Sequence, residues 1–161
     1  TIIDGWVHTG DIGEFDSENY LKITDRKKDI IVNAGGDNIS PSRIEAKLDI
    51  EPEIAQSMLY GDYKNYLVAV IVPDKEQAIK WAEKNNKNGT ISKIVKDEFF
   101  IKNIREVLAR VNKNLSVIEQ VKKFILIDHE FTIENNMMTP SMKVRRFKVK
   151  EMYADKLDNL Y

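Results

Sequence analysis

The sequence predicts a small α+β domain, with a three-stranded β-sheet flanked by helices and a β-hairpin in front of it. Short runs of β-branched residues indicate buried strands, and the most apolar of them is 66–72 (YLVAVIV). Segments with apolar residues at helical spacing lie between and after these runs. At 161 residues with 42% hydrophobic side chains, the chain is long enough to bury one core.

The composition disfavours several classes of function. The formal net charge is -1, from 25 basic and 26 acidic side chains, so no global positive field favours nucleic acid as a partner. The chain has no cysteine, and we expect His8 and His129 at the surface or in packing, with no metal site. No apolar run approaches the roughly 20 residues that span a bilayer. We therefore expect a cytoplasmic protein with no transmembrane segment, which still allows peripheral contact with a membrane.

The first predicted element is the hairpin. Residues 11–16 and 20–24 alternate apolar and polar side chains, and the polar run 16–19 (DSEN) between them favours a turn. One hairpin is too small to be stable alone, so it belongs either to the following domain or to one upstream. Because the chain begins at Thr1 rather than Met, we expect a piece of a longer protein.

Residues 24–45 (TDRKKDIIVNAGGDNISPSRIE) hold the most unusual chemistry of the chain. A charged cluster at 25–29 precedes the apolar triplet 30–32, which predicts a short buried strand. Gly35 and Gly36 favour a tight turn, because glycine reaches positive φ and lets backbone amides approach a ligand closely. An ordinary β-turn is the alternative for this glycine pair.

A helix is expected to start directly after this turn. Ser40 lies where an N-cap belongs, and Pro41 suits the first helical position. Ile39 and Ile44 have the spacing of a hydrophobic staple across the helix start. The pattern predicts a helix from Pro41 to about Leu48.

Two strands and a helix follow. Residues 54–60 and 66–72 predict strands joined by the turn 61–65, and the second strand is apolar enough to be central and covered on both faces. Residues 75–84 predict a helix, which gives way to the polar loop 85–89.

The last third of the chain predicts two helical segments around a strand. Thr90 is a candidate N-cap for one long or one broken amphipathic helix that extends to about Asn114. Residues 121–128 predict the third strand of the sheet, and 134–136 predict a turn. A final helix is expected to carry Phe147, Tyr153, Leu157 and Leu160.

Three separated stretches together resemble the C-terminal end of the adenylate-forming acyl-CoA synthetases. They are 5–13 (GWVHTGDIG), the cluster 25–29 with the glycine turn and helix start after it, and 139–146 (TPSMKVRR). The resemblance covers nearly the whole chain. Among the branches of the superfamily, the HTGDIG form, the helical stretch before the third strand and the TPSMK segment look most like long-chain fatty acid CoA ligases.

The resemblance implies a nucleotide site at Asp11 and Arg26. The family's aspartate at the position of Asp11 binds both ribose hydroxyls of ATP and acyl-AMP, and the two oxygens of a carboxylate suit a vicinal diol. The arginine that Arg26 matches contacts the ribose and phosphate region, a role suited to a planar guanidinium. From the residues alone, Asp11 could instead cap a turn, and Arg26 could pair with Asp25 or Asp29 in solvent.

The resemblance also implies that Lys143 is the catalytic residue. The first half-reaction joins a carboxylate to the α-phosphate of ATP and expels pyrophosphate, and a desolvated ammonium stabilises the negative charge that gathers on the oxygens. The family's near-terminal lysine has this role. The alternative is a lysine in a basic run before a helix. Arg145 and Arg146 would either help to hold phosphate or face solvent.

Two further features imply motion and CoA binding. Lys28 matches the hinge about which the small C-terminal domain rotates between the adenylating and thioester-forming arrangements. In the second arrangement, the Gly35–Gly36 turn would line the channel for the pantetheine arm of CoA. Several relatives carry a lysine where this chain has Gly35, so that lysine's role would be absent here.

We therefore expect residues 1–25 to be a hairpin remnant of a large N-terminal AMP-binding domain and 26–161 to be the mobile C-terminal lid. The implied function is an acid–thiol ligase, a long-chain fatty acid CoA ligase, with fatty acid, ATP, Mg2+ and CoA as substrates and the missing N-terminal domain as partner. The family's phosphate loop, adenine pocket and acyl tunnel precede 5–13, so this chain alone should be inactive.

Two alternatives remain open at this stage. The chain could come from a relative that adenylates another carboxylic acid. It could also be a non-catalytic interaction module, in which the helix at 99–111 binds a partner or a membrane surface.

Overall fold

The structure is a computed structural model that describes residues 2–87 and 89–161. Its centre is a sheet of three strands, β7 (Ile54–Tyr60), β8 (Leu67–Pro73) and β9 (Val121–Leu126), in the order β7-β8-β9. Strand β8 pairs antiparallel with β7 and parallel with β9. Every residue of β8 is buried, which confirms the prediction of a central strand covered on both faces.

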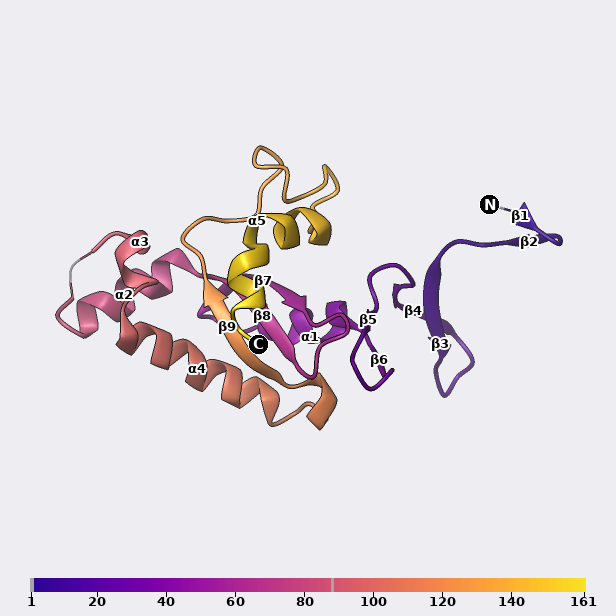
Figure 1. Ribbon diagram of the computed structural model, residues 1–161, viewed down its shortest axis with the longest axis horizontal. Helices are drawn as coiled ribbons and strands as arrows, with labels where there is room; N and C mark the ends of the chain where they lie inside the picture. Colours follow the sequence, from indigo (N-terminus) through magenta and orange to yellow (C-terminus); the bar gives the residue numbers. More distant parts are fainter. Residues whose placement is uncertain (1, 88) are drawn as a thin grey trace.

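The two faces of the sheet have separate cores, because successive side chains of β8 point to opposite sides. Helices α1 (Pro41–Leu48), α2 (Lys75–Lys84) and α4 (Glu98–Asn112) contribute to the core on one face, together with Leu67, Ala69 and Ile71. Helix α5 (Arg146–Asp158) contributes to the other core, together with Val68, Val70 and Val72 (Figure 1). The predicted α+β class is confirmed.

The predicted helix after the polar loop is broken. It consists of α3 (Ile91–Ile94), which follows Thr90, and α4. The Asp97 carboxylate accepts hydrogen bonds from the amides of Phe99 (2.9 Å) and Phe100 (3.2 Å), so it caps α4 and starts a new helix. A short 3-10 helix, η1 (Val117–Glu119), then leads into β9.

The terminal helix α5 is anchored by Val149, Tyr153 and Leu157, which are all buried. It is kinked at Tyr153, where φ is −112° and ψ is 16°. Phe147, in its first turn, is exposed instead. Across the described residues, no helix has the length and apolar content needed to cross a membrane.

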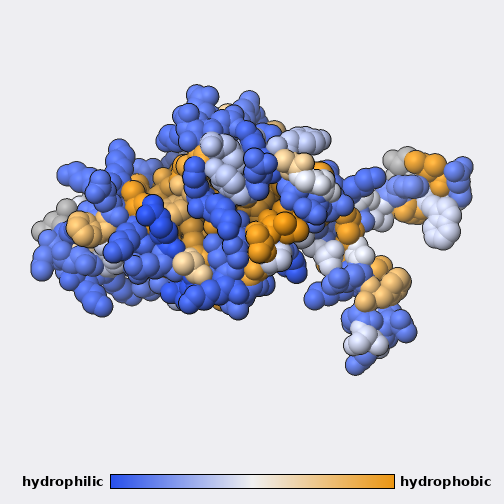
Figure 2. Space-filling view, turned by 60° about the horizontal axis from the view of Figure 1, so that its bottom comes forward, coloured by the Kyte–Doolittle hydropathy of each residue, from blue (hydrophilic) through white to orange (hydrophobic). Residues whose placement is uncertain are grey.

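The predicted hairpin is confirmed as β3 (Asp11–Phe15) paired antiparallel with β4 (Leu21–Arg26). A second, smaller hairpin of β1 (Ile2–Ile3) and β2 (Trp6–Val7) precedes it. Together they form an N-terminal arm, residues 2–26, which projects from the body, residues 30–87 and 89–161 (Figure 1). Figure 2 shows hydrophobic side chains on the surface of this arm, and those exposed are Ile2, Ile3, Trp6, Val7, Ile12, Phe15, Tyr20, Leu21 and Ile23.

The glycine turn lies between two short strands, β5 (Ile31–Val32) and β6 (Asn38–Ile39), which pair only with each other. Two residues of the predicted triplet, Ile31 and Val32, thus form a strand, but it is not part of the main sheet. Helix α1 starts at Pro41, also as predicted. Ile39 and Ile44 are both buried in the same core, in agreement with the staple spacing.

Candidate functional site

Asp11 and Arg26 meet across the hairpin. They are directly opposite each other in the β3–β4 register, and Arg26 Nε lies 3.0 Å from Asp11 Oδ1. The ion pair that the sequence left open for Arg26 is therefore formed with Asp11 rather than with Asp25 or Asp29. Both side chains keep exposed surface, 26% for Asp11 and 50% for Arg26, so each can still reach a ligand.

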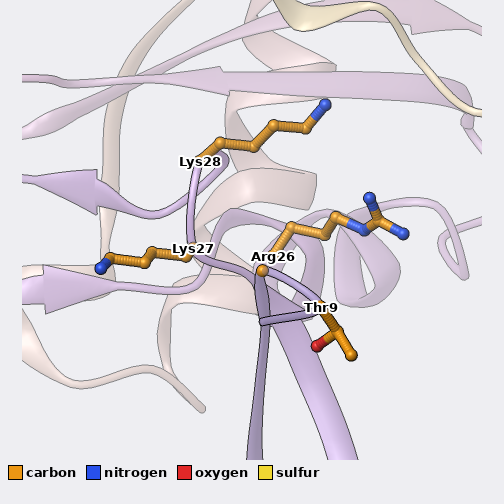
Figure 3. A pocket seen from close by; sticks show the side chains of 5 residues that line it. Thr9, Arg26, Lys27 and Lys28 are labelled. Carbon is orange, nitrogen blue, oxygen red and sulfur yellow. The ribbon is translucent and has the colours of Figure 1, made fainter. Parts of the chain in front are cut away.

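The Arg26 side chain borders an open hollow of about 480 Å³, which Thr9, Gly10, Lys27 and Lys28 also line. Figure 3 shows Arg26 and Lys28 extending to the same side, while Lys27 points the opposite way. The Lys27 amide donates to the Gly10 carbonyl (2.9 Å), which joins two of the residues that line the hollow. Arg26 and Lys28 therefore place positive charge on one side of the hollow (Figure 3), which suits an anion such as a phosphate group.

Lys28 lies in the turn that joins the arm to the body. The amides of Asp29 (2.9 Å) and Ile30 (3.2 Å) both donate to the Arg26 carbonyl and so close this turn. The Lys28 side chain is exposed. A single exposed turn between two structural regions is where a few backbone torsions can change without disturbing a core.

Asp25 is a buried carboxylate that the sequence analysis did not single out. It accepts four hydrogen bonds, from Ser40 Oγ (2.6 Å), Ser42 Oγ (3.0 Å), the Ser42 amide (3.4 Å) and the Arg26 amide (2.7 Å). Burial alone would raise the pKa of Asp25, but these hydrogen bonds outweigh burial and lower it. The carboxylate ties the arm to the start of α1.

Ser40 holds the predicted N-cap position, yet its hydroxyl does not cap the helix. That hydroxyl donates to Asp25, and the Asp25 carboxylate accepts the Ser42 amide in the first helical turn. A residue from the arm therefore supplies the cap that the sequence assigned to Ser40.

The glycine turn is closed by Asn33 and Asp37. The Asn33 amide donates to the Asp37 carbonyl (3.1 Å), the Asp37 amide donates to Asn33 Oδ1 (2.9 Å), and Asn33 Nδ2 donates to Asp37 Oδ2 (2.9 Å). Gly36 has a φ of +86°, which a side chain would strain, so the predicted tight turn is present. The Ala34 amide donates to the Lys64 carbonyl (3.0 Å) and holds the turn against the β7–β8 connection.

Lys143 lies on a small loop between β9 and α5. Met138 and Val144 form an isolated antiparallel bridge at the base of the loop. The Thr139 amide donates to the Lys143 carbonyl (2.9 Å), and the Lys143 amide donates to Thr139 Oγ1 (3.1 Å). The loop is thus well defined, and the Lys143 side chain is exposed at its end.

The structure brings some predicted site residues together and leaves others apart. Asp11, Arg26 and Lys28 gather around the hollow and its rim. The connection between β9 and α5, drawn in orange, lies at the top of the body in Figure 1, away from the arm. The predicted nucleotide pair and Lys143 therefore occupy separate surfaces in this arrangement.

Glu45 and Arg146 form a buried ion pair that the sequence analysis missed. Of the two alternatives left open for Arg146, the solvent-facing one is wrong, because only 21% of its side chain is exposed. Burial alone would lower the pKa of Arg146, but its bonds to Glu45 and the charges of Asp29 and Asp25 raise it. A signal was present, because Glu45 lies among the apolar positions of α1, where a carboxylate must be paired.

The remaining polar clusters do not resemble a metal centre. In the part of the chain that the structure describes, no three His, Cys, Asp or Glu side chains are grouped to hold a metal ion. His129 Nε2 lies 2.7 Å from the Tyr153 hydroxyl, and the Trp81 ring packs edge-on against Phe100 at 5.0 Å. These contacts are packing interactions.

Comparisons with known proteins agree on one family. The family model of the AMP-binding enzyme C-terminal domain matches residues 28–161. The long-chain-fatty-acid–CoA ligase FadD15 of Mycobacterium tuberculosis is 36% identical over 160 residues, which cover 98% of this chain and 27% of that protein. Long-chain-fatty-acid–CoA ligase 1 of Homo sapiens is 36% identical over 161 residues, 98% of this chain and 23% of that protein. The chain thus spans about a quarter of the length of these relatives.

Solved structures give the same fold. The adenylation domain of a carboxylate reductase from Mycobacterium chelonae superposes with a TM-score of 0.82 at 29% identity, over 98% of this chain and 23% of that one. The A domain of a carboxylic acid reductase from Segniliparus rugosus, solved with AMP and a co-purified carboxylic acid, gives 0.78 at 27% identity, over 95% and 23%.

Proposed function

The chain belongs to the family of AMP-binding enzyme C-terminal domains, and on this premise we propose that it is the C-terminal part of a long-chain fatty acid CoA ligase. Two observations support the ligase class. Relatives with that name are 36% identical over nearly the whole chain. The chain spans about a quarter of their length, as expected for one part of a longer enzyme.

In this proposal, residues 1–25 belong to the large N-terminal domain and 26–161 form the mobile lid. The family model starts at residue 28, inside the turn that joins arm and body. The arm exposes apolar side chains on β3 and β4, among them Phe15, Leu21 and Ile23, which a larger domain would cover. The start of the family model and the exposed apolar surface both support this division.

The reaction begins with attack of a fatty acid carboxylate oxygen on the α-phosphorus of ATP. The bond to pyrophosphate breaks, and acyl-AMP forms. Asp11 would accept hydrogen bonds from the ribose hydroxyls, and Arg26, held beside it at 3.0 Å, would contact the ribose and phosphate region. Lys143, on its well-defined loop, would stabilise the negative charge that develops on the reacting oxygens. Mg2+ would enter with ATP.

The second half-reaction uses CoA. Its thiol, after loss of the proton, attacks the acyl carbon and AMP leaves. We propose that the body rotates about the turn at Lys28 between the two steps. The Gly35–Gly36 turn, which is exposed and lacks side chains, would then line the channel for the pantetheine arm.

The pairing of Asp11 with Arg26 beside the cationic hollow is the observation in the structure that carries this proposal. The residue that tests it is Lys143. In the full-length enzyme, Lys143→Ala should lower the rate of pyrophosphate release from fatty acid and ATP by at least about 100-fold. It should leave thioester formation from preformed acyl-AMP and CoA close to that of the unsubstituted enzyme.

Lys148→Ala is the matched control, because 41% of the Lys148 side chain is exposed and its ammonium pairs with Glu151 at the surface of α5. It should leave both half-reactions unchanged. Equal loss of both half-reactions in Lys143→Ala would exclude the role assigned to Lys143.

A second candidate is a ligase for another carboxylic acid. The solved structures similar to this chain include adenylation domains of carboxylic acid reductases, at 29% and 27% identity, and this similarity supports the second candidate. Pyrophosphate release measured with fatty acids of several chain lengths and with aromatic acids separates the two. A preference for aromatic acids would select this second candidate.

The interaction-module alternative has less support. On the 99–111 helix, Phe100, Ile104, Leu108 and Val111 are buried in the core, which leaves Phe99 as the large apolar side chain exposed there. One exposed phenylalanine is a small surface for a partner or a membrane.

A further inference from the structure

The ion pair between Glu45 and Arg146 has no role in the reaction described above, yet it adjoins the loop that carries Lys143. Both side chains are largely buried, with 11% of Glu45 and 21% of Arg146 exposed. Arg146 Nη1 and Nη2 bind the two carboxylate oxygens of Glu45, one each. A bidentate pair of this kind fixes the direction of the guanidinium as well as its distance.

Glu45 is itself held firmly by the body. It lies in α1 between Ile44 and Leu48, which are fully buried. Its Oε1 also accepts the buried Leu59 amide of β7 at 2.7 Å. Helix α1 and the edge of the main sheet therefore fix the carboxylate, and the carboxylate is a rigid anchor for Arg146.

The backbone from Arg146 back to Lys143 is hydrogen-bonded at successive positions. The Arg145 amide donates to the Met137 carbonyl (2.7 Å), Val144 bridges Met138, and the Lys143 carbonyl accepts the Thr139 amide (2.9 Å). Arg146 is the first residue of α5, directly after these contacts. A change in the direction of Arg146 would therefore be passed to the whole loop.

We propose that Arg146 is a positioning residue, which through its ion pair with Glu45 fixes the direction in which the Lys143 loop leaves the body. The inference rests on the proposed function, because it concerns the adenylation role of Lys143. In this account Arg146 acts through Glu45, which accepts one hydrogen bond from each of its terminal nitrogens, and a direct contact of Arg146 with phosphate is the alternative that the test below excludes.

The test uses Arg146→Met and Glu45→Gln in the full-length enzyme. Arg146→Met keeps an apolar stem of similar length, and Glu45→Gln keeps an oxygen acceptor for the Leu59 amide. Helix α5 retains Val149, Tyr153 and Leu157 as core anchors, so folding should be preserved.

Each variant should lower kcat for pyrophosphate release between about 10-fold and 100-fold, because a displaced catalytic group loses most of its effect. KM for ATP and thioester formation from preformed acyl-AMP should stay within about threefold. The double variant should be no slower than the slower single variant, since the two residues act as one unit. Arg146→Lys should be intermediate, because it keeps the charge without the planar fork.

Other results would overturn the inference. If Arg146 bound phosphate, Arg146→Met would raise KM for ATP and Glu45→Gln would have no effect. If the pair were only structural, both half-reactions would fall together with Tm, and Arg146→Lys would be no better than Arg146→Met. If Arg146→Met does not fold, Glu45→Gln and Arg146→Lys decide between these outcomes.

Two controls separate this inference from the proposed function. Lys148→Ala breaks an exposed ion pair of the same helix and should change neither half-reaction. If Lys143→Ala abolishes pyrophosphate release while Arg146→Met and Glu45→Gln behave like the unsubstituted enzyme, the positioning role alone is wrong. If Lys143→Ala is fully active, the proposed function itself is wrong.

Discussion

The arm and the body both contain β-strands, but apolar side chains are exposed on the strands of the arm and buried in the central strand of the body. In β8 of the body, residues 67–73 are all buried, between two layers of helices and loops. In β3 of the arm, residues 11–15 are all exposed, and Phe15 shows 70% of its surface. Burial of a strand on both faces contributes strongly to the free energy of folding of its domain, whereas an exposed two-stranded hairpin has only marginal stability in water. The body is thus a complete fold and the arm is not.

The two regions are joined by polar contacts rather than by a shared core. Asp25 at the end of the arm binds Ser40 and Ser42 of the body, and these hydrogen bonds reach across the turn that contains Lys28. A connection of this kind is directional and can be broken without exposing a core. This kind of connection is compatible with the rotation about Lys28 that we propose.

The largest effect expected from this contrast is in the core of the body. Ile71→Ala in β8 should lower the free energy of unfolding by about 2 to 5 kcal/mol, because it leaves a cavity at a fully buried position. Ile23→Ala in β4 should cost less than about 0.5 kcal/mol, since that side chain is 57% exposed. Urea unfolding of the 161-residue chain, followed by circular dichroism, measures both. Similar losses would show that the arm contributes to the core.

A smaller effect is expected at the junction. Asp25→Ala removes the acceptor of four hydrogen bonds and should cost about 1 to 3 kcal/mol at pH 7. Ser17→Ala, in the exposed hairpin turn, is a control that should cost almost nothing.

The pH dependence of that loss can also be predicted. Because the pKa of Asp25 is lower in the folded chain than its ordinary value of 3.8, the ionised carboxylate stabilises the fold above that value. This stability is lost as the pH falls below 3.8 and through the folded pKa. The difference in unfolding free energy between the unsubstituted chain and Asp25→Ala should therefore shrink from pH 5 to pH 2. A constant difference would indicate that Asp25 does not titrate with folding.

The smallest effect concerns the turn itself. Lys28→Pro in the full-length enzyme fixes φ at one value and should slow one half-reaction at least about tenfold more than the other, or about 1.4 kcal/mol in barrier height. Lys28→Ala keeps the backbone free and should affect both half-reactions alike. Pyrophosphate release and thioester formation, measured separately, give the ratio. If Lys28→Pro slows both steps equally, the turn is a static connection.

Local patterns in the sequence were sufficient for most of the elements. The apolar run 66–72 predicted the central strand, and Ser40 followed by Pro41 predicted the start of α1. The glycine pair predicted the turn in which Gly36 adopts positive φ. Each of these depends on the residues themselves and on their near neighbours, so the sequence contains the information directly.

Contacts between distant segments were harder to predict. The bonds of Asp25 to Ser40 and Ser42, and the pair of Glu45 with Arg146, join residues that no local pattern relates. The same holds for the parallel pairing of β9 with β8. The carboxylate of Glu45 among apolar positions of α1 indicated a partner, but not which one.

The sequence by itself therefore determined most of the elements, the family that the chain resembles and the candidate residues Asp11, Arg26 and Lys143. Only the tertiary structure decided that Asp11 and Arg26 form a pair, that Asp25 links arm and body, and that Arg146 pairs with Glu45. The physical reason is the distance along the chain over which each kind of interaction acts. Backbone preferences and side-chain periodicity act over a few residues, whereas a buried charge takes whichever opposite charge the folded chain brings to it.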